Sequence, residues 1–168
     1  MKIKSLFFFS LFFLNGILAS VKQPFANDSI KKGKVILVSS SLGVALAGSY
    51  LYIENSWWNE KQRGFHFDNG SDKVYALNVD KVGHFIGGLQ AADIFSSSMQ
   101  WAGMGKKQSL WYGAAFGSGL QLAIEMKDAY APYWGFSKWD LGLGSAGAFL
   151  PVAKYYSPKL KAFDVKLS

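Results

Sequence analysis

Uncharged apolar stretches alternate with polar turns along this chain, and none of the stretches shows the period-two alternation of a half-buried strand. The pattern predicts helices at residues 35–53, 80–104, 109–131 and 137–156. Residues 54–79 are polar and rich in turn residues, which predicts an exposed loop, and the other connections are short. The sequence therefore predicts an all-α fold, an antiparallel bundle of about four apolar helices.

The predicted helix ends carry recognisable signals. Ser137 suits the N-cap of the last helix, with Asp140 three residues later as an approximate capping-box partner. Residues 103–108 form a short basic turn before the third helix. Residues 132–136, which include a proline and a glycine, break the chain before the fourth. Pro151 is expected to kink or shorten that last helix.

The N-terminus has the pattern of an export signal. Lys2 and Lys4 precede an apolar run, and small residues follow it, so residues 1–20 are interpreted as a signal peptide, with an uncleaved anchor helix as the alternative. The rest divides into a polar lead-in at 21–34, a helical domain at 35–158 and a basic tail at 159–168. The expected location is the bacterial cell envelope, either periplasmic or membrane-associated.

Several features favour helices embedded in a membrane. The uncharged run from Val35 to Ile53 is long enough to cross a bilayer core. All six tryptophans lie near the ends of predicted helices, as in an aromatic belt. Small residues also recur at close-packing spacing, in the pairs Gly113 and Gly117, and Gly43 and Ala47.

Other features favour a compact helical domain outside the cytoplasm. The uncharged part of the last helix, Leu141 to Ala153, is short for a membrane span. Signal cleavage would place the lysines of the lead-in outside the cytoplasm, and antiparallel helices would bring Lys106, Lys107 and the basic tail to the same side. That arrangement inverts the positive-inside pattern. Both alternatives remain open at this stage.

Composition removes several classes of function. The chain has no cysteine, which excludes disulfides, thiolate metal sites, a cysteine nucleophile and a lipid anchor on an N-terminal cysteine. The formal charge is +7, but Arg63 is the single arginine, which argues against nucleic-acid and phosphate sites. The lysines suit either an anionic lipid surface or ordinary solvation. The Gly142–Gly147 run matches GxGxxG without a preceding strand, so no nucleotide is expected.

One group of polar residues stands out. Asp80 and His84 are four residues apart and share a helix face, and Gln121, Glu125 and Asp128 form a second stripe. In antiparallel packing, the start of the second helix, the end of the third and the start of the fourth meet at one end of the bundle. We therefore expect a polar cluster made of Asp80, His84, Glu125, Asp128 and Asp140.

Two interpretations of this cluster compete. Carboxylates held close together need a cation or a proton, so His84, Glu125, Asp128 and Asp140 are candidate ligands of Mg²⁺, Mn²⁺ or Zn²⁺, with Asp80 orienting His84. Alternatively, the cluster is an ion-pair network that fixes the helix packing, neutralised by Lys81, Lys127 and Lys138. No catalytic residue is assigned, and a divalent metal is the one cofactor considered.

Three motifs resemble a known family. Asp80-Lys81-Val82-Gly83-His84-Phe85, then Glu125-Met126-Lys127-Asp128, then residues 135–140 with Gly147 are similar to the signature of the YfiM-like proteins. These are predicted periplasmic lipoproteins with a domain of unknown function. The resemblance covers about residues 80–150 and implies an envelope location and a helical domain, but no activity or ligand. Without a cysteine, lipid anchoring does not carry over, and the uncharged segment 35–53 could provide attachment instead.

Two functions therefore remain. The favoured hypothesis is a non-enzymatic envelope protein that associates with membrane lipid or with an envelope protein, its polar cluster holding the helices together. The alternative is a membrane-associated, metal-dependent hydrolase that acts on a lipid or a cell-wall precursor. The shortage of arginine weakens phosphate esters as substrates.

Overall fold

The computed structural model describes residues 30–70 and 78–162, and within them every regular element is helical. The elements are α2 (Lys32–Ser56), α4 (Val79–Trp101), α5 (Lys106–Asp128), α6 (Lys138–Tyr156) and the short 3₁₀ helix η1 (Pro158–Ala162). The predicted all-α bundle is confirmed. The signal-peptide prediction for residues 1–20, most of the lead-in and the end of the basic tail lie outside the described residues.

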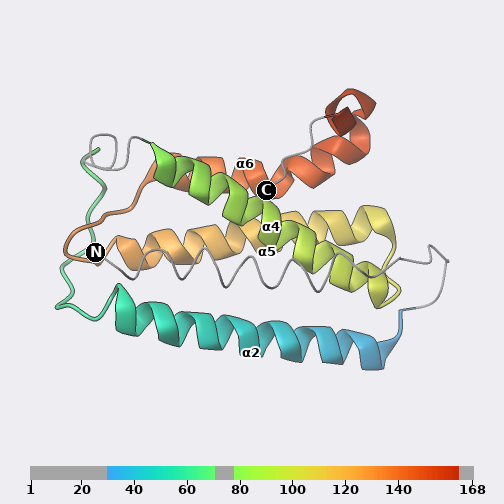
Figure 1. The fold of residues 1–168 in the computed structure, drawn as a ribbon, viewed down its shortest axis with the longest axis horizontal. Helices are drawn as coiled ribbons and strands as arrows, with labels where there is room; N and C mark the ends of the chain where they lie inside the picture. Colours follow the sequence, from blue (N-terminus) through green and yellow to red (C-terminus); the bar gives the residue numbers. More distant parts are fainter. Residues whose placement is uncertain (1–29, 71–77, 163–168) are drawn as a thin grey trace.

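The helices run alternately up and down (Figure 1). α4 and α6 point the same way, and α5 runs in the opposite direction. Among the described elements, these three helices pack most extensively against one another. α2 runs antiparallel to α4, because the backbone N–H of Lys31 donates to Ala102 O at 2.9 Å near one end of α2, and Lys127 of α5 forms an ion pair with Glu54 near the other.

Two predicted boundaries shift. α2 begins at Lys32, so it takes Lys32 and Lys34 from the expected lead-in. α5 begins at Lys106, so the expected turn at 103–108 shrinks, and Lys106 and Lys107 belong to the first helical turn. Gly103, with φ 95°, allows the tighter turn because its left-handed backbone suits glycine. α6 continues through Pro151 to Tyr156 and is not shortened by it.

One of the two hydrogen bonds predicted for the N-terminal cap of α6 is present. The Ser137 hydroxyl accepts a hydrogen bond from the Asp140 N–H at 3.3 Å, so Ser137 is the N-cap. In a capping box, the third residue would return a bond to the Ser137 N–H. Here Glu125 of α5 accepts that N–H instead, at 2.7 Å. The cap of one helix is therefore completed by its neighbour.

Glycines set the distance between the three central helices. A Cβ at Gly88 would collide with the backbone of Gly144, and one at Gly147 with the carbonyl of Phe85, so α4 and α6 approach at backbone contact. Gly113 and Gly117 face the backbone of α4 in the same way, which confirms the predicted close packing of that pair. The buried positions of α4, α5 and α6 are accordingly mostly Gly, Ala and Ser.

α2 stands apart from this core. Val38 is its one buried residue, and the exposed apolar side chains of the helix include Ile36, Val44 and Leu51. The expected close packing at Gly43 is wrong, because no atom of another described element lies within 4 Å of its Cβ position. Among the described residues, α2 is the one helix long and apolar enough to cross a membrane. By that criterion the other predicted helices do not qualify.

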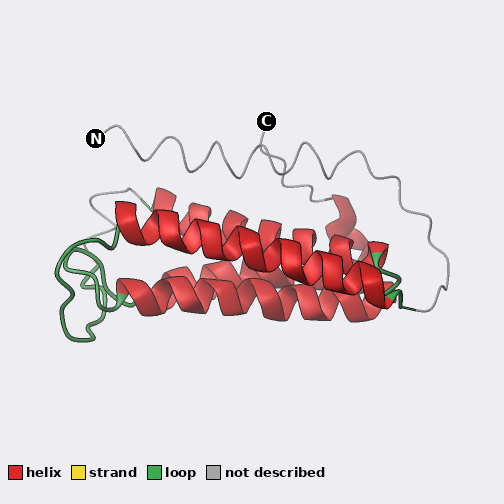
Figure 2. Ribbon diagram, turned by 90° about the horizontal axis from the view of Figure 1, so that it is seen from below, coloured by secondary structure: helices red, strands yellow, loops and turns green. Residues whose placement is uncertain are grey.

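The two long loops gather at one end of the bundle (Figure 2). The loop after α2 and the loop between α5 and α6 pair through Asp68 N–H to Phe136 O at 3.0 Å and Phe136 N–H to His66 O at 2.9 Å. A Cβ at Gly135 would meet the backbone of Asp68, so only a glycine lets the two loops touch. The paired loops cover the end of the bundle at which α5 ends and α6 begins.

Candidate functional site

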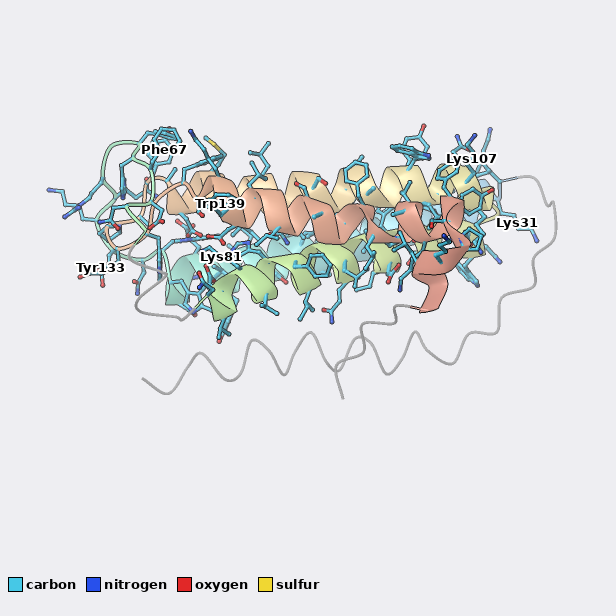
Figure 3. All side chains as sticks on the ribbon, turned by 90° about the horizontal axis from the view of Figure 1, so that it is seen from above. Lys31, Phe67, Lys81, Lys107, Tyr133 and Trp139 are labelled. Atoms are coloured by element: carbon cyan, nitrogen blue, oxygen red, sulfur yellow. The ribbon has the colours of Figure 1, made fainter. Side chains whose placement is uncertain are left out.

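The predicted polar residues meet at the loop-covered end of the bundle. α4 contributes Asp80 and His84 from its first two turns, α5 contributes Glu125 and Asp128 from its last turn, and α6 contributes Asp140 from its first. Figure 3 shows this end at the labels Lys81 and Trp139, opposite the end that carries Lys31 and Lys107. Up-and-down topology brings these residues together because each lies where its helix meets the same end.

His84 is held by a neighbour on α5. Its Nδ1 lies 2.8 Å from Gln121 Oε1. Because an amide oxygen can only accept, this pairing puts a proton on Nδ1 and leaves Nε2 facing the acids. Nε2 lies 3.6 Å from Glu125 Oε1 and 3.8 Å from Asp80 Oδ1. The imidazole therefore bridges a buried and an exposed carboxyl group.

Glu125 is the largest fully buried side chain of the described part, with 2% of its surface exposed. Burial raises its pKa to about 7, against the lowering effects of the Ser137 N–H and of His84. Near neutral pH this carboxyl group is consequently balanced between its acid and its ionised form.

Asp128 faces the loop after α2. The Trp58 indole N–H donates to Asp128 Oδ1 at 2.7 Å, and Trp58 is itself buried. Burial raises the pKa of Asp128 to about 6, although the indole hydrogen bond and His84 act to lower it. Trp58 and Ser137 are thus part of the site. The sequence offered no spacing signal for Trp58, whereas the predicted cap at Ser137 pointed to the right place.

Asp140 lies deepest among the acids of α4 and α6, with 3% of its surface exposed. Its Oδ1 accepts no hydrogen bond within the described residues, and Lys81 Nζ lies 3.5 Å away. Asp80, His84 and Asp140 each offer one atom that could bind a metal, and these atoms lie within 4.8 Å of one another. They form a possible metal-binding group whose Asp80 side is open to solvent.

This group differs from the ligand set proposed from sequence. Asp80 enters it directly, whereas its expected role was to orient His84. Glu125 and Asp128 are outside it; one Glu125 oxygen accepts the Ser137 N–H, and one Asp128 oxygen accepts the Trp58 indole N–H. Of the three expected neutralising lysines, Lys81 pairs with Asp140, Lys127 pairs with Glu54, and Lys138 lies over the ring of Phe67.

The arrangement can do two things chemically. It can hold α4, α5 and α6 and the loop after α2 in register, because Glu125, Asp128 and Asp140 each contact an element other than their own. It can also offer two carboxylates and an imidazole to a divalent cation from its solvent side.

Comparison with known proteins gives one match. A family model described as predicted periplasmic lipoprotein (DUF2279) matches residues 67–156, which is more than half of the chain. The matched segment contains α4, α5, α6 and the cluster, and α2 lies before it. No curated protein matches the chain, and no solved structure does.

Proposed function

The chain belongs to the DUF2279 family of predicted periplasmic lipoproteins, a family of unknown function in the bacterial cell envelope, and from this premise we propose that it is a non-enzymatic protein attached to a membrane through α2. The polar cluster then fixes the packing of the domain that α2 attaches. The motifs at 80–85, 125–128 and 135–140 favour a place near the YfiM-like proteins within the family.

The observation that carries the proposal is the exposed apolar surface of α2. Val35 to Ile53 contains no charge and would extend about 28 Å as a helix, close to the thickness of a bilayer core. Val44, midway along it, is 74% exposed. An exposed apolar surface of this length is typical of contact with lipid or another protein. Because this chain has no cysteine, α2 takes the attachment role that a lipid has in a lipoprotein.

α2 is also an apolar helix near the N-terminus, as a signal sequence is. Contacts at both of its ends favour a lasting place in the protein. Lys34 Nζ donates to Trp101 O at 3.2 Å at its start, and Tyr50 packs on Trp58 near its end, with ring centroids 6.4 Å apart. Because Trp58 also binds Asp128, the end of α2 is coupled to the polar cluster.

The test asks whether membrane attachment depends on the apolar residues of α2 in particular or on exposed apolar residues in general. The triple variant Ile36→Gln, Val44→Gln, Leu51→Gln should move the protein from the membrane fraction to the soluble fraction of cells and should abolish its flotation with vesicles. A control variant with Val79→Gln, Val82→Gln and Tyr133→Gln, whose side chains are equally exposed, should stay with the membrane. Equal release of both variants, or retention of the α2 variant, would overturn the proposal. Circular dichroism checks that each variant is folded.

A second candidate function rests on the Asp80, His84 and Asp140 group. A divalent metal held there would supply a Lewis acid and an activated water, as in a metal-dependent hydrolase acting on a lipid or a cell-wall precursor. The buried Asp140 Oδ1, which accepts no hydrogen bond within the described residues, supports this candidate. The ammonium group of Lys81, 3.5 Å from the same oxygen, supports the structural role instead.

Metal analysis decides between the two candidates. A hydrolase of this kind should retain one equivalent of metal after dialysis and lose it in Asp80→Asn, a substitution at a half-exposed position that spares the fold. His84→Ala and Glu125→Ala complete the series. If the wild-type protein carries no metal and does not gain thermal stability with Mg²⁺, Mn²⁺ or Zn²⁺, the metal candidate is excluded and the packing role remains.

A further inference from the structure

At one end of the bundle, all the charged side chains among the described residues are basic. Figure 3 shows Lys31 and Lys107 together at this end, far from Lys81 and Tyr133. α2 begins there, α4 ends there, α5 begins there, and α6 ends there. We call it the basic end, and its lysines are Lys31, Lys32, Lys34, Lys106, Lys107, Lys154 and Lys159.

The acidic residues that the structure describes lie elsewhere. Asp93 is in the second half of α4. The other described acids lie at the loop-covered end, together with five basic residues. These acids are Glu54, Glu60, Asp68, Asp80, Glu125, Asp128 and Asp140. Among the described residues, charge is therefore separated along the bundle axis, and the separation arises because antiparallel helices bring distant segments of the chain to the same end.

An aromatic groove opens at the basic end. It has a volume of about 720 Å³ and is lined by Lys106, Lys107, Trp111, Tyr112 and Tyr155, among others. The first turn of α5 contains no acid, and no side chain caps it, so its positive dipole adds to the two lysines. Nearby, Lys34 Nζ lies 4.2 Å from the centre of the Trp101 ring.

We propose that the basic end binds the anionic headgroups of a phospholipid membrane. Lysines at an anionic bilayer surface contribute to binding one by one, without a shaped pocket, and tryptophan and tyrosine favour the headgroup level. The inference rests on the proposed function in one respect: α2 starts at this end, so its lipid-facing surface is continuous with these lysines. Arginine is the residue type best suited to hold a single phosphate, and Arg63 lies at the other end.

The test compares two kinds of vesicle. The purified full chain is mixed with vesicles of phosphatidylcholine alone or with phosphatidylglycerol added, and flotation gives the partition coefficient. Wild-type protein should bind the anionic vesicles at least tenfold more tightly at low ionic strength. The variant Lys106→Gln, Lys107→Gln should lose a measurable part of that gain, and Lys61→Gln, Arg63→Gln, with the same change of charge at the opposite end, should retain all of it. Screening by 0.5 M NaCl should remove the gain, since surface charges are screened at that concentration.

Each outcome separates this inference from the proposed function. Binding to phosphatidylcholine without any gain from phosphatidylglycerol would overturn the proposal for the basic end and leave the proposed attachment through α2 intact. Binding to anionic vesicles alone would support headgroup binding by the basic end and overturn the proposed attachment through α2. Equal losses in the two charge variants would show a net-charge effect without a defined surface. Competition by 10 mM inorganic phosphate at constant ionic strength would indicate a free-anion site and would also overturn the proposal.

Discussion

At the scale of single residues, the buried Glu125 dominates the polar cluster. It contacts His84 of α4 and accepts the N–H of Ser137 at the start of α6, so its two oxygens serve two different helices. Its acid form is favoured by burial, as is that of Asp128. The cluster therefore couples helix packing to protonation, whatever else it does.

A pH dependence of stability follows. The pKa of Glu125 is raised from 4.5 to about 7 and that of Asp128 from 3.8 to about 6. The native state then binds more protons than the unfolded state between about pH 4 and 7, so the free energy of unfolding must fall as pH rises through this window. We expect a loss of roughly 4 kcal/mol between pH 5 and pH 8, measured by urea denaturation.

Two variants check the origin of that dependence. Glu125→Gln should flatten the profile and be at least as stable as wild type at pH 8, because a neutral amide oxygen can still accept the Ser137 N–H. Glu60→Gln, at an exposed loop position, should leave the profile unchanged. A profile that keeps its full slope in Glu125→Gln would contradict the assignment.

At the scale of elements, glycine contacts decide how α4, α5 and α6 pack. The helices approach so closely that a methyl group at Gly88 would overlap the backbone of Gly144. Such contact does not depend on large apolar side chains, and it brings the first turns of α4 and α6 close enough for Lys81 to reach Asp140. The geometry of the cluster is therefore set by small residues outside it.

A matched pair of glycine substitutions tests this packing. Gly88→Ala should destabilise the protein by about 2–4 kcal/mol, since backbone atoms of α6 cannot move aside without separating the helices. Gly119→Ala in α5, where the added methyl group meets no atom of the described residues within 4 Å, should instead stabilise it by about 0.5–1 kcal/mol through helix propensity. Thermal and urea unfolding measure both. A small effect of Gly88→Ala would mean that α4 and α6 are not in backbone contact.

At the scale of the whole molecule, α2 differs from the three central helices in its exposed apolar surface. The family match covers the central helices and the cluster, while α2 precedes it and adds an exposed apolar surface. The tryptophans also lie at the two ends of the bundle. Trp101 and Trp111 are at the basic end, and the others are in or beside the loops at the opposite end. The lengthwise arrangement of aromatic, basic and acidic groups suits a protein positioned against a membrane.

The state of the mature chain tests this division. We expect cleavage after the signal peptide at about residue 20 to leave α2 in the protein, because α2 contacts α4 and α5 at its two ends. Intact-mass analysis of the protein recovered from the cell envelope measures where the chain begins. A mature chain that starts beyond Ser56 would show that α2 is itself removed, and attachment through α2 would then be abandoned.

The sequence by itself determined the helices and the end of the bundle at which Asp80, His84, Glu125 and Asp140 lie. Hydrophobic periodicity and turn residues are local properties, and antiparallel order follows from short connections. Only the tertiary structure decided which groups pair. Glu125 completes the cap at Ser137, and Trp58 binds Asp128. Gly43 meets no neighbour among the described residues, while Gly113 and Gly117 do. These contacts depend on distances between segments far apart in the chain. Pairing across helices is set by how closely backbones approach, and no spacing along one segment carries that information.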